Sequence, residues 1–592
     1  MVINQKLMQI RKLMANRGIS AFIVTTSDPH QSEYLADYYK TREFISGFTG
    51  SAGTVVITRD EAILWTDGRY FIQAAYELSG SDFELYKMGV PGTMSITEFL
   101  LDRVQPGGKI GFDGNCVSYK LYRELLENLD DRMLIGNLDF IDSIWKDRPA
   151  LPKEKVFIHE IKYTGTSAGR RIEKVREEME TKGVDYYLVS ALDDIAYLYC
   201  IRGNDISYNP VVFSYAVIEK DRALFFVDLD KLEDDVRDYL DENSIEYREY
   251  DEIRNYLSEI PGKSCLLFDP ATVNLNTVES VNSNVKLIKS GSIVQNIKAV
   301  KNETEINCLK NAYLKDGVAL VKFFNWVETG TPTGTVSEVL ASKKLLSMRE
   351  QQSDFIEPSF ETIPAYGENA AMPHYSPNPA SPVYLKPEGL FLVDSGGQYL
   401  DGTTDITRTI ALGKLTDDEK KHYTLTLKSH ISLASAYFKK GATGYYLDAF
   451  ARLPLFKYKM DYAHGTGHGV GFFLNVHEGP QSISAVYKDV PIKEGMVVSI
   501  EPGLYIDGSH GIRIENIAYV KSIEKNDFGE FLGFEILSIV PIDTRPVIVE
   551  LLSDEELKWL NDYNKKCYEL LSDYLTGSDL MYLEEATKEV IR

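Results

Sequence analysis

The sequence of 592 residues predicts a mixed α/β (α+β) protein in which two related α/β domains precede a larger third domain. Three observations predict this fold class. An apolar helical pattern in the first part of the chain recurs 165 residues later, a new helical pattern starts near Lys298, and strand patterns with glycine-rich turns dominate from about residue 355. We therefore expect domains at 1–158, 159–297 and 298–592.

The two N-terminal domains begin with matching helices. Their apolar residues share one helical spacing and end at a glycine: Leu7, Ile10, Met14 and Gly18 in the first copy, and Ile172, Val175, Met179 and Gly183 in the second. A strand-like run follows each glycine, at 21–24 and 186–189, and similar strand–turn–strand patterns follow at 55–68 and 217–228. Because the glycine that ends the helix and the strand that follows it recur together, we interpret the two segments as an internal duplication rather than a chance similarity.

The third region opens and closes with helices. The segment 298–330 begins with Asn, Glu and Thr, which favour a helix start, and continues with helical apolar periodicity. The segment 555–575 is helical again. No low-complexity linker separates the regions, so we expect short joints.

Composition excludes several functions. With 64 Lys and Arg against 88 Asp and Glu, the net charge of −24 repels phosphate backbones, which argues against nucleic-acid partners. The five cysteines form no CxxC motif, so a disulfide framework and a thiolate zinc site are not expected. No segment reaches the about 20 apolar residues of a membrane span. The sequence predicts a cytoplasmic protein without a membrane partner.

Three of the nine histidines, His464, His468 and His477, fall in the segment HGTGHGVGFFLNVHEGP (464–480). Its glycines disfavour a helix, and in an extended chain His464 and His468 would lie on one face. A lone histidine is more often a core residue. Three this close, among glycines that let a ligand approach the backbone, indicate a site.

Carboxylates complete a set of metal ligands. Asp394 ends an apolar strand, Asp405 opens the next, Glu501 follows a β-branched strand, and Glu515 is predicted in the middle of another strand. Each alone is more often a salt bridge. Together with His468, the four carboxylates would balance two divalent cations, between which a bridging water loses a proton to give hydroxide. The oxygen-rich set favours Mn²⁺, with Zn²⁺, Co²⁺ and Fe²⁺ also possible.

These motifs resemble the pita-bread metallopeptidases and, within them, the long three-domain branch of the aminopeptidase P (Xaa-Pro aminopeptidase) family. The resemblance rests on AAMPHYSP (370–377), VDSGGQYLDGTTDITRT (393–409), HGTGHGVGFFLNVHEGP (464–480), SIEPG (499–503) and GIRIEN (511–516), and on HQSEYLADYYKTREFISGFTGSAGT (30–54) and TDGRYFIQAAYEL (66–78). It implies two creatinase-type N-terminal domains followed by a catalytic pita-bread domain.

The resemblance also implies roles. Asp394, Asp405, His468, Glu501 and Glu515 would be the metal ligands, with Asp405 and Glu515 bridging the two ions. Glu501 would in addition act as general base and proton shuttle for the bridging water.

Three histidines and one arginine would act on the substrate, again by resemblance. His477 would polarise the scissile carbonyl and stabilise the oxyanion, while His374 and His464 would position the substrate around its proline. Arg513 would orient the site.

The implied reaction is hydrolysis of the bond between an N-terminal residue and a penultimate proline. Peptides with proline in the second position would be the substrates, and a homodimer is expected from the family. The bond is a tertiary amide without an N–H, so a specialised pocket is needed. Phe360 and Tyr366 are candidate wall residues.

Three alternative functions fit parts of the sequence. A prolidase-type dipeptidase shares the ligand set, but the duplicated N-terminal half favours aminopeptidase P. An inactive peptide- or histone-binding module is disfavoured by the intact ligands. The motif GTSAG (165–169) could place Ser167 on a nucleophile elbow, but a helix cap explains Ser167 more simply.

Overall fold

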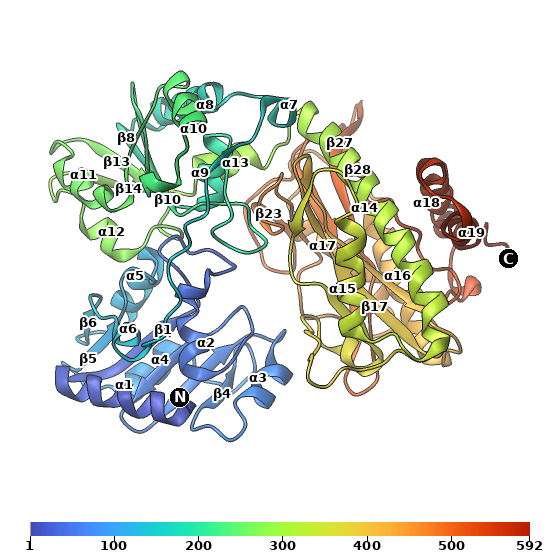
Figure 1. Ribbon diagram of the computed structural model, residues 1–592, viewed down its shortest axis with the longest axis horizontal. Helices are drawn as coiled ribbons and strands as arrows, with labels where there is room; N and C mark the ends of the chain where they lie inside the picture. The colour runs from blue at the N-terminus through green and yellow to red at the C-terminus, as the bar shows by residue number, and fades with distance from the viewer. Residues whose placement is uncertain (1) are drawn as a thin grey trace. The chain divides into compact units, whose positions relative to one another are not determined.

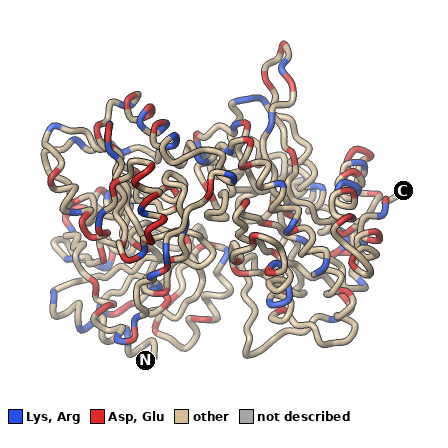
Figure 2. The backbone as a smooth tube through the Cα atoms, turned by 45° about the horizontal axis from the view of Figure 1, so that its top comes forward, with Lys and Arg blue, Asp and Glu red and all other residues tan. Residues whose placement is uncertain are grey.

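The computed structural model describes residues 2–592 and divides them into two compact units. Among them, unit 1 comprises residues 2–160 and Thr166–Gln295, and unit 2 comprises Ile161–Gly165 and Asn296–Arg592. Basic and acidic residues are interspersed over both units (Figure 2). Among the described residues, no helix is long and apolar enough to cross a membrane.

Unit 1 holds two six-stranded sheets with one topology (Figure 1). The first has the order β4-β3-β2-β1-β5-β6 and the second β12-β11-β10-β8-β13-β14. In both, the first strand of the copy pairs antiparallel with the second and parallel with the fifth. The strands are β1 (Ile19–Thr25), β2 (Thr54–Thr58), β3 (Ala62–Thr66), β4 (Glu84–Lys87), β5 (Lys109–Phe112) and β6 (Met133–Ile135), then β8 (Tyr186–Val189), β10 (Ser214–Glu219), β11 (Ala223–Val227), β12 (Ile245–Glu249), β13 (Cys265–Phe268) and β14 (Lys286–Lys289). The predicted duplication is confirmed.

The matching helices also end as predicted. Helices α1 (Ile3–Arg17) and α8 (Ala168–Lys182) stop at Gly18 and Gly183, whose φ angles of 64° and 63° are left-handed. Ser167 caps α8, because its hydroxyl accepts a hydrogen bond from the Arg170 N–H at 3.3 Å. The residues before Ser167 form a short helix, α7 (Ile161–Thr164), and not the strand that a nucleophile elbow needs, so the serine-hydrolase alternative is excluded.

A buried histidine joins the two halves of unit 1. His30 Nδ1 donates to the Ser190 carbonyl at 2.8 Å, and Nε2 accepts from the Tyr250 hydroxyl at 2.8 Å. The Tyr215 ring lies 4.5 Å from the imidazole. Burial lowers the pKa of His30 to about 3, so the ring is neutral at physiological pH.

Unit 2 packs helices against several small sheets. Its main helices are α14 (Glu303–Gly330), α15 (Glu338–Arg349), α16 (Asp417–Ala434), α17 (Gly444–Phe456), α18 (Asp554–Leu571) and α19 (Gly577–Ala586). Asn302 and Glu305 form a capping box at the start of α14, and Ser553 and Glu556 form another at α18. Both predicted helices are confirmed.

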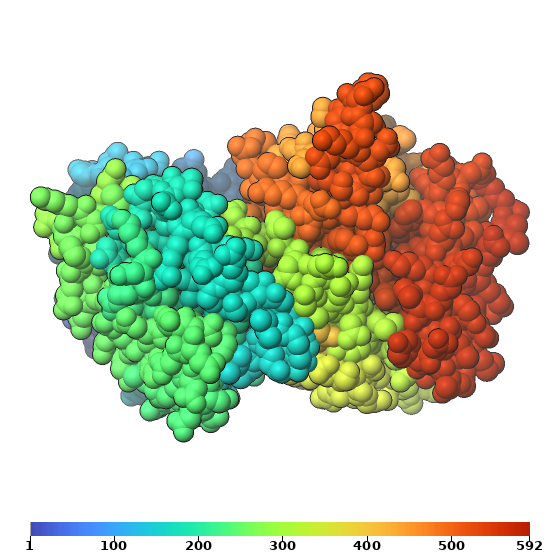
Figure 3. Space-filling view, turned by 90° about the horizontal axis from the view of Figure 1, so that it is seen from above, coloured from blue at the N-terminus to red at the C-terminus, as the bar shows by residue number. Residues whose placement is uncertain are grey.

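The strands of unit 2 carry the candidate site. One sheet has the order β16-β17-β20, another β21-β28-β27-β24-β22-β23, and β25 pairs with β26. The hairpin of β27 and β28 projects from the unit with exposed residues 522–528 (Figure 3). The bounds are β16 (Ile363–Tyr366), β17 (Leu390–Ser395), β20 (Ile406–Ala411), β21 (Phe438–Lys439), β22 (Gly467–Gly469), β23 (Glu478–Ile483), β24 (Val497–Ile500), β25 (Gly503–Ile506), β26 (His510–Arg513), β27 (Asn516–Asn526) and β28 (Gly529–Ile536).

Candidate metal centre

The two predicted aspartates come from neighbouring strands. Asp394 lies on β17, and Asp405 stands directly before β20. The two strands pair antiparallel, with Ser395 opposite Ile406 and Asp394 opposite Thr407. Both carboxylates are buried. The short connection between paired strands therefore brings two acidic side chains to one end of the sheet.

His468 lies among the carboxylates. Its Nε2 is 3.4 Å from Asp405 Oδ2 and 3.4 Å from Glu501 Oε1. Its Nδ1 is 2.8 Å from the Gly469 carbonyl oxygen, which can only accept. Nδ1 therefore carries the proton, and the lone pair of Nε2 is directed towards the acidic side chains. Ligand atoms of Asp405, His468 and Glu515 all lie within 4.8 Å of one another, as a shared cation requires.

The two glutamates stand one step beyond a strand ladder. Strands β24 and β27 are antiparallel and end with Ile500 opposite Asn516, so Glu501 and Glu515 come next. The prediction that Glu515 lies in the middle of a strand is wrong. It lies in the break between β26 and β27, where the chain passes from one sheet to another and the Glu515 N–H donates to the Thr407 carbonyl at 3.1 Å.

The negative charge of the acidic side chains exceeds the positive charge of the basic side chains nearby. Burial raises the pKa of Asp394 and of Glu501, and it raises the pKa of Glu515 well above the usual range, where the neighbouring carboxylates add to the effect. Arg513 opposes the shift of Asp394. Asp394 Oδ1 is buried without a hydrogen-bond partner in the described chain, residues 2–592. Such an oxygen is costly unless a cation binds it, so the residues fit a metal centre.

A hydrogen-bonded chain leads from Asp394 to His464. Arg513 Nη2 donates to Asp394 Oδ2 at 2.5 Å, and Arg513 Nη1 donates to the Tyr505 hydroxyl at 2.8 Å. The Tyr505 hydroxyl lies 2.8 Å from His464 Nε2. Because His464 Nδ1 faces the Gly465 carbonyl at 2.7 Å, Nε2 accepts the tyrosine proton. Burial raises the pKa of Tyr505 to about 12, which keeps this proton in place.

One expectation about this region is wrong. His464 lies in a bend and not in a strand, since β22 begins at Gly467, so the even spacing to His468 does not place both on one strand face. His464 is held by Tyr505 on β25 instead. The sequence analysis did not identify Tyr505, although it lies only four residues after Glu501, on β25.

His477 and His374 lie on loops, whereas the candidate wall residue Tyr366 lies on β16. The His477 ring is 4.3 Å from the His468 ring, at an angle of 89°, directly before β23. His374 follows Pro373, whose carbonyl accepts from Arg513 Nη2 at 3.4 Å. Tyr366 does not suit a pocket wall, because it pairs with Phe391 three ladder positions from Asp394 and its hydroxyl donates to the Glu388 carbonyl at 3.0 Å.

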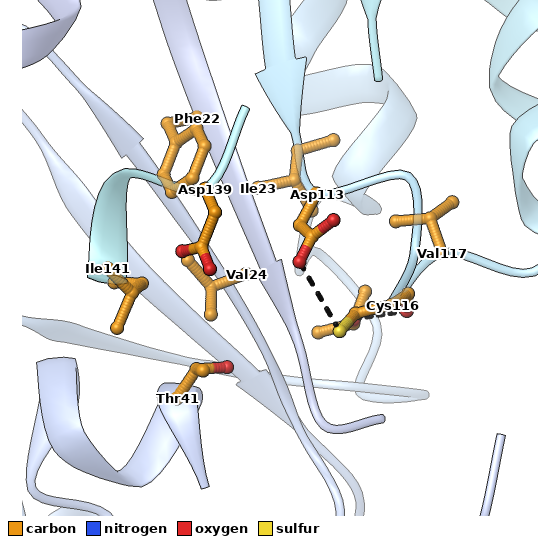
Figure 4. A pocket seen from close by; sticks show the side chains of 10 residues that line it. Phe22, Ile23, Val24, Thr41, Asp113, Cys116, Val117, Asp139 and Ile141 are labelled. Atoms are coloured by element: carbon orange, nitrogen blue, oxygen red, sulfur yellow. Dashed lines mark hydrogen bonds between the residues drawn. The ribbon is translucent and has the colours of Figure 1, made fainter. Parts of the chain in front are cut away.

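A pocket in unit 1 is separate from these residues (Figure 4). Asp113, Asp139 and Cys116 line it together with apolar residues of β1, and none of the predicted site residues does. Burial raises the pKa of Asp113 to about 6, and the Cys116 thiol donates to its carboxylate at 3.6 Å. These contacts satisfy the polar groups internally.

Family models match four parts of the chain. Residues 307–522 match metallopeptidase family M24, and 530–590 match the C-terminal region of peptidase M24. Residues 6–143 and 147–305 each match a creatinase/prolidase N-terminal domain. The two N-terminal matches agree with the duplicated topology of unit 1.

Several known proteins resemble the chain, and three of them match nearly its whole length. Aminopeptidase P2 of Arabidopsis thaliana is 40% identical over 98% of this chain and 87% of its own length, and a probable Xaa-Pro aminopeptidase P of Pyricularia oryzae is 41% identical over 99% of both. The crystal structure of an X-prolyl aminopeptidase from Caenorhabditis elegans, described as a cytosolic enzyme with a di-nuclear active site, has a TM-score of 0.95 at 34% identity and covers 100% of both chains. An Xaa-Pro dipeptidase from Bacillus anthracis has a TM-score of 0.51 at 25% identity and covers 64% of this chain and 99% of its own.

Proposed function

Because the chain belongs to metallopeptidase family M24, and within it to the Xaa-Pro aminopeptidases, we propose that it hydrolyses the bond between an N-terminal residue and a penultimate proline. The observation that carries this proposal is the convergence of four carboxylates, three of them buried, and His468, with one oxygen of Asp394 left for a cation. The relatives that match its full length bear this activity in their names.

The proposed organisation has three domains. We assign creatinase-like domains to 1–158 and 159–297 and the catalytic pita-bread domain to 298–592. The repeated sheet order of unit 1 supports the first two, and the helix that begins after Asn302 supports the start of the third.

Two divalent cations would occupy the site. Asp394, Asp405 and Glu515 would hold one of them, and Asp405, Glu515, His468 and Glu501 the other. We propose Mn²⁺, with Zn²⁺ or Co²⁺ as alternatives, because oxygen ligands outnumber the single imidazole. When bound, the cations would make a shared water more acidic and polarise the substrate carbonyl.

The protein side chains would move and hold protons. Glu501, whose pKa burial raises, accepts the proton of the attacking water and passes it to the proline nitrogen as that nitrogen leaves. This step matters for a prolyl bond, because the tertiary amide nitrogen has no proton of its own.

Histidines would hold the peptide. His477 donates a hydrogen bond to the scissile carbonyl oxygen, and its ring lies against that of His468. His464, fixed by Tyr505, and His374 position the residues on either side of the bond. Arg513 holds Asp394 and orients the site.

Partners and location follow from the same family. Peptides with proline in the second position are the proposed substrates, and the proposed location is the cytoplasm, as for the relative from C. elegans. We also propose a homodimer. The exposed apolar side chains of Tyr446, Leu453 and Phe456, spaced seven and three residues apart on α17, support an interface on that helix.

A substrate comparison tests the proposal. The purified protein is stripped with a chelator, supplied with Mn²⁺ and given an Xaa-Pro-Yaa tripeptide, an Xaa-Pro dipeptide and an N-acetylated tripeptide. We expect metal-dependent release of the first residue from the free tripeptide alone. Preference for the dipeptide would instead identify a prolidase-type enzyme, and no cleavage with any metal would favour a binding module.

A further inference from the structure

The positions of Glu501 and Glu515 depend on the end of one strand ladder. Ile500 and Asn516 form the last pair between β24 and β27, and the two glutamates follow at the next step, where no further ladder pair restrains them. Beyond that pair each glutamate is held by a different segment, since the Glu501 N–H donates to the Thr466 carbonyl at 2.8 Å and the Glu515 N–H donates to the Thr407 carbonyl at 3.1 Å. The last ladder pair is therefore the direct link between the two strand ends.

His430 on α16 contacts both members of this last pair. Its Nδ1 lies 3.0 Å from the Ile500 carbonyl oxygen, and its Nε2 lies 3.0 Å from Asn516 Nδ2. Because the carbonyl can only accept, Nδ1 donates to Ile500 and Nε2 accepts from the Asn516 amide. The side chain is fully buried, and burial, aided by the charge of Arg408, lowers its pKa to about 3. The neutral ring therefore provides one donor and one acceptor, as the two strands require.

The far side of Asn516 is fixed as well. Its Oδ1 accepts from Arg408 Nη2 at 2.7 Å and lies 3.0 Å from the Tyr563 hydroxyl, so its amide hydrogens must face His430. Arg408 Nη1 donates to the Glu515 carbonyl at 2.6 Å. The Trp559 ring lies 5.7 Å from His430. Helix α18 thus contributes two aromatic side chains behind the strand ends.

We propose that His430 is a positioning residue that clamps the last pair of the β24–β27 ladder and so holds Glu501 and Glu515 at the spacing that the two cations need. The inference rests on the proposed function, because the two cations belong to that proposal. It assigns His430 no contact with substrate or metal. Neighbours that orient ligands typically change metal affinity or activity about 10- to 100-fold when they are removed.

Three substitutions separate the two contacts. His430→Asn keeps a donor at the position of Nδ1 and so keeps the bond to Ile500, whereas His430→Gln keeps an acceptor at the position of Nε2 and so keeps the bond to Asn516. His430→Phe retains a ring of similar shape and loses both. Ser429→Ala is the matched control, because Ser429 is buried on the same helix but donates to the Ala451 carbonyl, away from the ligand strands.

The test measures Mn²⁺ binding to the stripped full-length protein by calorimetry, with kcat and KM for the tripeptide. For His430→Phe we expect a dissociation constant for Mn²⁺ about 10-fold or more above wild type, and a reduced kcat with little change in KM. The Asn and Gln variants should lie between Phe and wild type. The serine control should match wild type in both.

Several results would overturn the inference. If wild type binds two Mn²⁺ and cleaves the tripeptide while His430→Phe equals it in affinity and kcat, the clamp is wrong and the proposed function stands. If His430→Phe does not fold, unchanged Mn²⁺ affinity in both the Asn and Gln variants decides against the clamp. If wild type itself binds no metal, the proposed function fails first, and the role of His430 fails with it.

Discussion

The two carboxylate oxygens of Asp394 have different surroundings. Oδ2 accepts from Arg513, whereas Oδ1 is buried without a partner among residues 2–592. An unsatisfied buried oxygen on a group whose pKa burial raises is unfavourable in the protein alone. The cost is consistent with a site organised for a cation and not for the stability of the metal-free chain.

Replacing the single residue Glu501 tests the proposed proton transfer. Glu501→Gln keeps the size of the side chain and its place after β24, but an amide cannot accept the proton of the attacking water. We expect kcat for the tripeptide to fall by about 100-fold or more, with an unchanged far-UV circular dichroism spectrum. Normal turnover in this variant would rule out the proposed role of Glu501.

Replacing Asp405 tests the shared ligand. Asp405 lies near His468 and Glu515, so Asp405→Asn removes a charge that both cations are proposed to share. We expect Mn²⁺ content to fall from two towards zero per chain rather than from two to one. Elemental analysis after dialysis measures it, and full retention of both ions would contradict a bridging position.

The two helix ends in unit 1 allow a test at the scale of the element. Gly183 ends α8 at a φ of 63° and Gly18 ends α1 at 64°, and a Cβ at either would meet no atom within 4 Å. Any loss on substitution is therefore backbone strain alone. We expect Gly18→Ala and Gly183→Ala each to lower the free energy of unfolding by about 1 kcal/mol.

Gly291 is the matched control for these substitutions. It is exposed, a Cβ there also meets nothing within 4 Å, and its φ is not positive. Gly291→Ala should leave the denaturant midpoint unchanged or slightly raised. Equal losses at all three glycines would show that the left-handed conformation is not the cause.

Elements with local signals were predictable from sequence, and elements set by distant contacts were not. Helices α14 and α18 begin at capping boxes that the sequence displays. The break at Glu515 was not visible, because it arises where the chain leaves β26 for a different sheet. The bend at His464 was likewise hidden, because its anchor is Tyr505, 41 residues away.

At the scale of the whole molecule, the duplication and the order of domains could be read from recurring patterns and from family resemblance. The acidic and imidazole side chains of the candidate site can also be predicted from the sequence. The groups that support them were not, since Thr407 donates to Glu515 across 108 residues and His430 faces Asn516 across 86. Such pairs have no local periodicity, so only the fold reveals them.

The effect of metal binding on the stability of the whole chain should depend on pH. Burial raises the pKa of Glu515 and Glu501, so the folded metal-free state holds protons more tightly than the unfolded state. The contribution of these two groups to stability is therefore fully present below the unfolded carboxyl pKa of about 4.3 and is lost as pH rises through the raised values. Cations displace these protons, so Mn²⁺ should bind more tightly at higher pH.

The corresponding measurement is thermal unfolding with and without Mn²⁺ at two pH values. At about 100 times its dissociation constant, a bound ion adds about 2.7 kcal/mol. At one fixed concentration of Mn²⁺, we expect a larger rise in Tm at pH 8 than at pH 6. A rise that is equal at both, or larger at pH 6, would contradict a site of buried carboxylates with raised pKa values.

The central claim is that this chain cleaves Xaa-Pro bonds only when its carboxylates and His468 hold two cations. The most direct measurement titrates the stripped protein with Mn²⁺ and follows release of the first residue from an Xaa-Pro-Yaa tripeptide alongside the number of ions bound. The account predicts that activity appears with metal, saturates at two ions per chain and is absent for the N-acetylated tripeptide. Full activity in the stripped protein, or saturation at a single ion, would contradict it.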